Sequence, residues 1–91
     1  MHYEWDAAKA ASNLAKHRIS FAEATSVFQD EQAMIVADPY PDEERYVTIG
    51  MDASAKLLVV VFTWRGPDRV RLISARRATR WEHRVYAREV S

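Results

Sequence analysis

The sequence predicts an α+β fold: two helices, then an antiparallel sheet of about four strands in meander order, then a closing helix. Helical patterns with N-terminal capping residues occur near the start and again at the end of the chain. Between them the hydrophobic period changes to two, and turn residues separate the segments. The length of 91 residues allows one small domain, residues 1–91, so we expect a partner or self-association to add stability.

The N-terminal part carries two helix start signals. Asp6 is placed to cap a helix that ends at about residue 17, with its apolar positions at helical spacing. Ser20 and Glu23 have the three-residue spacing of a capping box, in which each residue satisfies a backbone amide of the other. We therefore expect a second, short helix over residues 21–28.

Four segments in the middle of the chain predict strands. Residues 56–64 are apolar almost without a break and rich in β-branched residues, as expected of a central strand that is covered on both faces. Residues 3–5 predict only an extended lead-in to the first helix. Residues 38–44 contain two prolines and four acidic residues and predict an exposed loop. The predicted strands are residues 33–37, 45–51, 56–64 and 69–76.

The closing segment combines a helix signal with an unusual charge. Thr79 and Glu82 form another capping box, which predicts a helix over residues 80–90. The formal net charge of zero hides two segments of opposite charge. Residues 1–60 carry five basic and ten acidic side chains, whereas residues 61–91 carry eight arginines, no lysine and three acidic side chains. The planar guanidinium binds phosphate or carboxylate bidentately, so this segment predicts the recognition of defined anions.

Three of these arginines, Arg80, Arg84 and Arg88, repeat every four residues and so form one row on the predicted helix. Arg76 and Arg77 lie at the junction between the last strand and this helix, where the helix N-terminus adds donors for an anion. The anion is RNA phosphate or the acidic side chains of a protein partner. The alternative is a solvated helix face with local salt bridges, and the sequence leaves both open.

Aromatic side chains are interleaved with the arginines. Trp64, Trp81 and Tyr86 are candidates for stacking on bases. Trp81 is equally suited to the core-facing side of the helix, together with Val85. The Tyr86 hydroxyl is a candidate proton donor or phosphate ligand, and the alternative is a half-buried tyrosine whose hydroxyl is already hydrogen-bonded.

Histidine is the usual proton acceptor near neutral pH. His17 ends the first predicted helix beside Lys16, where a histidine also serves as a structural cap that gains from the helix dipole. His83 lies in the last helix among cations that disfavour its protonated form. No spacing in the sequence brings the two histidines together.

Several classes of function are excluded or unsupported. The absence of cysteine excludes disulfides, thiolate chemistry and cysteine-bound zinc. No glycine-rich phosphate loop and no metal-ligand spacing is present, so we expect no cofactor and no metal. The longest apolar run, residues 57–62, is far too short for a membrane span, and the N-terminus lacks the features of a secretory signal, so we expect a cytoplasmic protein.

Several motifs together resemble one known family, over nearly the whole chain. They are YEWD at residues 3–6 with Lys9 and Asn13, the pair Lys16-His17, ISFAEATSVFQD at 19–30, ERYVTIG at 44–50, LLVVVFTWRG at 57–66, and RLISARRAT at 71–79 followed by Glu82 and Tyr86. In these features the chain resembles the BrnT toxins of type II toxin–antitoxin pairs.

The resemblance implies a RelE-like fold and a ribonuclease toxin that cleaves RNA without metal and stops translation. It also implies a cognate ribbon-helix-helix antitoxin of the BrnA type, a complex of two toxins with two antitoxins, and repression of their own operon through operator DNA. Arg65, Arg76, Arg80 and Tyr86 are then expected to be catalytic, with His17 as a further candidate. Arg77, Arg84, Arg88 and Lys16 are expected to bind RNA.

The chain departs from the family pattern in two places. The family commonly has glycine after the Lys-His pair, where this chain has Arg18, so a left-handed helix end is less favourable here. The family often has a glutamate where this chain has Trp64, so no catalytic role of that glutamate carries over. The sequence thus predicts a metal-independent endoribonuclease, and the alternative is a non-catalytic module whose arginine face docks an acidic or DNA-binding partner.

Overall fold

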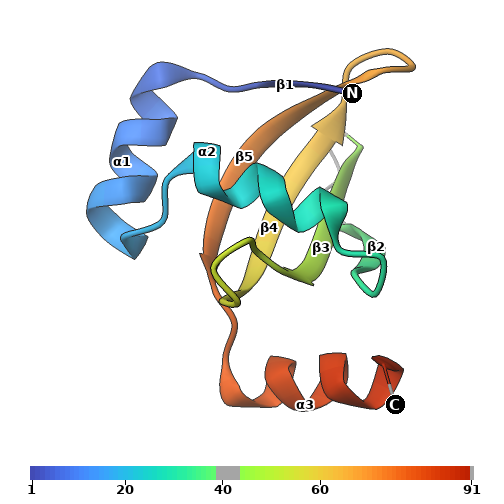
Figure 1. Ribbon diagram of the computed structural model, residues 1–91. Helices are drawn as coiled ribbons and strands as arrows, with labels where there is room; N and C mark the ends of the chain where they lie inside the picture. The colour runs from blue at the N-terminus through green and yellow to red at the C-terminus, as the bar shows by residue number, and fades with distance from the viewer. Residues whose placement is uncertain (39–43, 91) are drawn as a thin grey trace.

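The computed structural model describes residues 1–38 and 44–90. They form a five-stranded sheet, with the first helices packed on one face of it and the last helix below it in the view of Figure 1. The elements in chain order are β1 (His2–Glu4), α1 (Ala7–His17), α2 (Phe21–Ala24), the 3₁₀ helix η1 (Thr25–Gln29), β2 (Met34–Asp38), β3 (Arg45–Met51), β4 (Leu57–Trp64), β5 (Arg69–Arg77) and α3 (Arg80–Val90). The predicted α+β class and the order of elements are confirmed. The loop predicted at residues 38–44 falls mostly outside the described residues.

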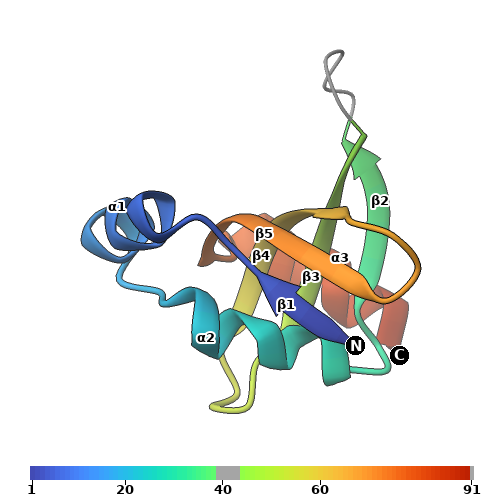
Figure 2. The ribbon, with the colours of Figure 1, turned by 90° about the horizontal axis from the view of Figure 1, so that it is seen from above.

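The sheet has the strand order β1-β5-β4-β3-β2. Strands β2 to β5 form the predicted antiparallel meander. The count of about four strands was wrong, because part of the extended lead-in pairs in parallel with β5, from His2 opposite Arg69 to Glu4 opposite Arg71. This pairing joins the N-terminal segment to the last strand of the sheet (Figure 2), and a segment of three residues carries no local signal for it.

The hydrogen bonds of the capping residues confirm the predicted helix starts. The Asp6 carboxylate accepts the backbone N–H of Lys9 at 2.9 Å, and the Ser20–Glu23 capping box is complete. At the start of α3, the Thr79 N–H donates to Glu82 Oε1 at 2.7 Å and the Glu82 N–H donates to Thr79 Oγ1 at 3.2 Å. Each box satisfies amides that a helix N-terminus otherwise leaves unpaired.

The second predicted helix is divided into two pieces. The α-helical part ends at Ala24, and residues 25–29 continue as a 3₁₀ helix. The Thr25 hydroxyl donates to the carbonyl of Ala22, and the Ser26 hydroxyl donates to the carbonyl of Glu23. Such side-chain bonds compete with the regular helical pattern, which explains the tighter turn.

One hydrophobic core lies between the sheet and the first helices. In Figure 1, α2 crosses in front of the sheet, and its buried side chains pack on β4 and β5. Leu58, Val60 and Phe62 of β4 are fully buried on this side, and Val59 on the other side is also buried, so β4 is covered on both faces as predicted. The core members are Ile19, Phe21, Ala24, Val27, Leu58, Val60, Phe62, Val70, Leu72 and Ala75.

Asn13 attaches α1 to the edge of β5. Its side chain, 7% exposed, donates to the carbonyl of Ala75 at 2.8 Å and accepts the Ala75 N–H at 3.1 Å. It also donates to the carbonyl of Ile19 at 3.0 Å. Because β1 ends opposite Arg71, this amide takes the place of a neighbouring strand further along β5.

The helix α1 ends in a left-handed conformation at Arg18, although arginine favours this conformation less than the glycine common in the family. Arg18 has φ 61° and ψ 26°, and its N–H donates to the carbonyl of Leu14. A side chain in this region costs free energy that glycine avoids, so the buried Asn13 and Ile19 on either side hold the turn.

Candidate functional site

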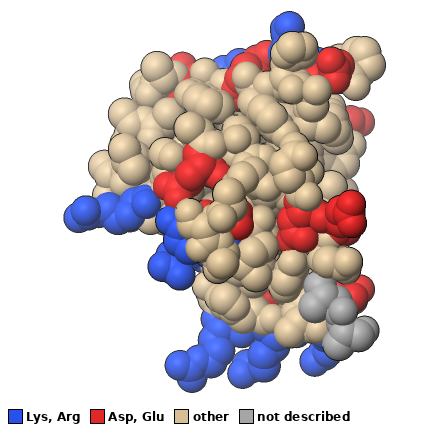
Figure 3. Space-filling model, in the orientation of Figure 1, with Lys and Arg blue, Asp and Glu red and all other residues tan. Residues whose placement is uncertain are grey.

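Basic side chains from three elements gather at one edge of the molecule. The C-terminal ends of α1 and β5 lie near each other in Figure 1, and α3 runs below them. Figure 3 shows Lys and Arg side chains along this lower edge, over α3, and at the lower end of α1. We call this surface the basic edge and define it by its residues, Lys16, His17, Arg76, Arg77, Arg80, Arg84 and Arg88.

The α1 part of the basic edge is positioned by Asn13. Its two hydrogen bonds to Ala75 place α1 alongside β5, and the two elements run in the same direction. Lys16 and His17, about one turn further along α1, line a cleft with Ile73 and Ser74 of β5. Lys16 is exposed and His17 is half-buried.

Arg76 forms a bidentate ion pair with Glu82. Its two terminal nitrogens donate to the two carboxylate oxygens, each at 2.9 Å, and join the end of β5 to the first turn of α3. The hydrogen bonds from Arg76 lower the pKa of Glu82 to about 2, helped by the Thr79 amide, and the same pair raises the pKa of Arg76. With the Glu82 side chain 13% exposed, this guanidinium holds α3 in place.

The arginine row lies on the outer face of α3. Arg80, Arg84 and Arg88 are exposed, whereas Glu82, Val85 and Tyr86 on the opposite side of the helix are half-buried. In residues 1–38 and 44–90, the side chains of Arg80 and Arg84 make no hydrogen bond or ion pair. The predicted row is therefore present and accessible to an external anion.

Tyr86 is hydrogen-bonded on the inner side of α3. Its hydroxyl donates to Asp30 Oδ2 at 2.6 Å, and this bond raises the pKa of Tyr86 to about 12. Burial acts to raise the pKa of Asp30, but the donors Met51 N–H, Tyr86 and Gln32 N–H outweigh it and lower that pKa. At neutral pH the neutral Tyr86 phenol donates to the ionised Asp30 carboxylate. This hydrogen bond attaches α3 to the segment between η1 and β2.

Arg65 lies at the opposite end of the sheet from the basic edge. It follows β4 in the hairpin before β5, and its N–H donates to the carbonyl of Arg69 at 2.8 Å. Seven residues of strand separate Arg69 from Arg76, which corresponds to roughly 23 Å. The structure therefore places Arg76, Arg77 and Arg80 at the junction of β5 and α3, with His17 at the end of α1 beside β5, and leaves Arg65 apart from them.

The family model described as "Ribonuclease toxin, BrnT, of type II toxin-antitoxin system" matches residues 5–82. The chain belongs to the BrnT family of ribonuclease toxins. The fold is similar to that of the Brucella abortus ribonuclease toxin BrnT in its crystal structure, with a TM-score of 0.66 and 24% identity over 88% of this chain and 100% of that one. No curated protein matches the sequence.

In this BrnT-family chain the aromatic candidates are divided between two places. Trp81 is 64% exposed on α3, so the core-facing alternative for this side chain was wrong. Val85 and Tyr86 take the inner side of the helix in its place. Trp64 packs edge-on against Phe62 near the distant hairpin. His83 is exposed on α3, and its imidazole makes no hydrogen bond or ion pair among the described residues.

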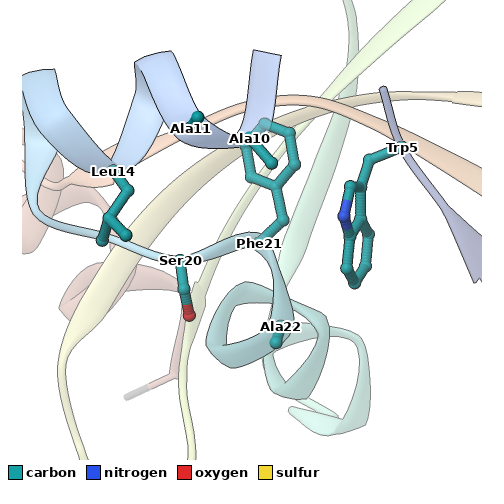
Figure 4. A pocket seen from close by; sticks show the side chains of 7 residues that line it. All are labelled: Trp5, Ala10, Ala11, Leu14, Ser20, Phe21 and Ala22. Atoms are coloured by element: carbon teal, nitrogen blue, oxygen red, sulfur yellow. The ribbon is translucent and has the colours of Figure 1, made fainter. Parts of the chain in front are cut away.

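This chain also has an apolar groove between α1 and α2, away from the basic edge. Figure 4 shows its lining side chains, with Leu14 and Trp5 at the two ends and Phe21 between them. The Ser20 hydroxyl at its rim belongs to the capping box. No titratable side chain lines this groove, so it offers no acid–base chemistry.

Two partners of the predicted site residues were missed from the sequence. Asp30 is 56 residues from Tyr86, and no local pattern connects them. Glu82 was expected to be a capping residue and, in the solvated-face alternative, a local salt-bridge partner, but its bidentate pair with Arg76 through both oxygens was not foreseen. Within the part of the chain that the structure describes, no group of three or more His, Asp or Glu side chains is arranged to hold a metal ion.

No helix among the described residues is long and apolar enough to cross a membrane.

Proposed function

We propose that this chain is an endoribonuclease toxin that cleaves RNA without metal and inhibits translation in the cytoplasm. The observation that carries the proposal is the basic edge, where exposed guanidiniums of α3 and of the end of β5 share one edge of the molecule with the C-terminal end of α1, which carries His17. A surface of this kind binds phosphates along an RNA strand, because each phosphate is a bidentate acceptor. Membership of a ribonuclease toxin family supports the same reading.

In the proposed reaction, the ribose 2′-hydroxyl attacks the adjacent phosphorus, and the bond to the 5′-oxygen breaks. His17 accepts the proton of the 2′-hydroxyl, and water returns a proton to the leaving 5′-oxygen. Arg80 and Arg77 donate hydrogen bonds to the phosphate oxygens, where negative charge increases in the transition state. Arg76 adds positive charge from the position that Glu82 fixes, and the products carry a 2′,3′-cyclic phosphate and a free 5′-hydroxyl.

We assign different roles to the other expected site residues. Tyr86, with its pKa raised to about 12 and its hydroxyl on Asp30, positions α3 and is a weak proton donor at neutral pH. Arg84, Arg88 and Lys16 bind the RNA backbone on either side of the cleaved phosphate. Arg65, at the distant hairpin, contacts only RNA that extends beyond the site.

The partner in this proposal is a ribbon-helix-helix antitoxin of the BrnA type, in a complex of two toxins and two antitoxins that binds operator DNA through the antitoxin. Acidic side chains of the antitoxin would cover the arginine row and exclude RNA from it. Assignment to a type II toxin–antitoxin family supports a protein partner.

A non-catalytic docking module is the second candidate. It is favoured by the engagement of Arg76 with Glu82 and of Tyr86 with Asp30, since both groups are already hydrogen-bonded without substrate. Under this reading the arginine row binds only the partner protein. Purified, partner-free protein that leaves RNA intact would support it.

Induced expression of variants tests the proposed site. We expect Arg80→Ala to restore growth, because loss of one donor to a developing oxyanion costs about 100-fold or more in rate. We expect Arg76→Ala to restore growth as well, because it removes a positive charge from the site and the ion pair that holds α3 on β5. Arg69→Ala removes one positive charge at the distant end of β5 and is the matched control, expected to stay toxic. Full toxicity of both site variants would remove these arginines from the mechanism.

A further inference from the structure

A cleft between α1 and β5 collects side chains that donate hydrogen bonds. It has a volume of about 210 Å³ and lies on the side of α1 away from the apolar groove of Figure 4. Three basic side chains, two hydroxyls, one amide and one aliphatic side chain line it: Lys9, Lys16, His17, Ser12, Ser74, Asn13 and Ile73. No carboxylate is among its lining residues.

Most of these donors are not used within the chain. The Asn13 amide is committed to the backbone of Ile19 and Ala75. By contrast, the side chains of Lys9, Ser12 and Ser74 make no hydrogen bond or ion pair within residues 1–38 and 44–90, and the same holds for Lys16 and His17. Unpaired donors that surround one concave space, with no acid among them, favour an anionic ligand.

A bulge in β5 forms the floor of the cleft. Ser74 lies opposite Val61 and Leu72 lies opposite Phe62, so Ile73 is the extra residue without a partner across the strands. The bulge lies beyond the end of β1, where the outer edge of β5 faces α1. Bulges redirect side chains and are frequent beside functional sites, and here Ile73 and Ser74 both line the cleft.

The size of the cleft selects a compact anion. Sites for drug-sized ligands have volumes of about 300–1,000 Å³, so this cleft suits a phosphate group better than a whole nucleotide. Lys16 and His17 belong both to the cleft and to the basic edge. A strand that passes over the basic edge therefore reaches the cleft without leaving the protein surface.

We propose that this cleft is a phosphate subsite of the RNA, in which Lys9, Lys16, Ser12 and Ser74 bind the phosphodiester next to the one that is cleaved. The inference rests on the proposed ribonuclease function and adds Lys9, Ser12 and Ser74 to the binding residues. It sets the path of the strand, from the arginine row on α3 past His17 to the exposed side of α1.

The test is amide NMR of the full chain, titrated with inorganic phosphate and, separately, with a single-stranded 2′-O-methyl RNA. This RNA lacks the nucleophilic hydroxyl, so binding is measured whether or not the protein cleaves. We expect both probes to shift the amides of Ser12, Lys16 and Ser74. The double variant Lys9→Gln, Lys16→Gln should weaken RNA binding about tenfold, and Arg69→Gln, at the other end of β5, should change it less than twofold.

Three results would overturn the subsite: RNA shifts confined to α3, RNA affinity of the double variant equal to wild type, or shifts with phosphate but none with RNA, which would mean a general anion site only. The amide spectrum of each variant also reports whether it is folded. The two proposals can be distinguished by experiment. RNA cleavage without chemical-shift changes at the cleft amides contradicts only the proposed subsite. Cleft binding without cleavage of ordinary RNA contradicts only the proposed catalysis.

Discussion

At the scale of single residues, the ionisable groups of α3 divide into a structural and an accessible set. Glu82 and Tyr86 point inward, and each makes a short hydrogen bond to another element. Arg80 and Arg84 point outward without a partner in the described part of the chain. The like charges of the row repel one another, and a bound polyanion would offset that repulsion.

The Arg76–Glu82 pair predicts how stability depends on pH. The pKa of Glu82 is about 2 in the folded chain against 4.5 for the ordinary carboxyl, so its contribution is present above pH 4.5 and is lost as the pH falls toward 2. Because Arg76 is 40% exposed, solvent reduces this contribution to on the order of 1–2 kcal/mol. The free energy of unfolding, measured with urea at pH 7 and at pH 3, should fall less between the two pH values for Glu82→Gln than for wild type. An equal decrease in both proteins would contradict a stabilising role of the pair.

At the scale of elements, α3 depends on two attachments at its inner face. Arg76–Glu82 joins its first turn to β5, and Tyr86–Asp30 joins its middle to the segment before β2. Among the residues whose burial the structure describes, the main hydrophobic core contains none from α3. Few buried apolar contacts and a few polar attachments are the conditions under which an element opens locally.

Removal of the second attachment should loosen α3 selectively. In Tyr86→Phe we expect amides of residues 84–88 to exchange hydrogen roughly tenfold faster, while β4 stays protected. The ultraviolet titration of the same variant should lose the tyrosine component with a pKa of about 12. Tyr46→Phe is the matched control, since its ring stacks on Phe62 and its hydroxyl makes no hydrogen bond among the described residues. Unchanged exchange in Tyr86→Phe would show that the hydrogen bond does not hold α3.

The elements also show what could be predicted from the sequence. Asp6, Ser20–Glu23 and Thr79–Glu82 act within three residues, so the helix starts could be predicted. The row on α3 follows from helical periodicity alone. The β1–β5 pairing, the Asn13–Ala75 bonds and the Tyr86–Asp30 bond join residues 56 or more positions apart, and no local pattern specifies them.

At the scale of the whole molecule, the fold separates the charges that cancel in the sequence. Five of the eight arginines of the last 31 residues (Arg76, Arg77, Arg80, Arg84 and Arg88) and the basic end of α1 form one cationic edge, although the net charge is zero. Such an edge attracts an anionic strand without making the protein basic overall. The account therefore depends on one claim, that this edge cleaves RNA through its own side chains.

Incubation of the purified, partner-free protein with a defined RNA in excess EDTA, followed by analysis of the product ends, tests that claim most directly. The account predicts cleavage that the chelator does not change, with 2′,3′-cyclic phosphate and 5′-hydroxyl ends, and loss of cleavage in Arg80→Ala. Cleavage that requires added Mg²⁺ and leaves 3′-hydroxyl ends, or no cleavage with or without ribosomes, would contradict it.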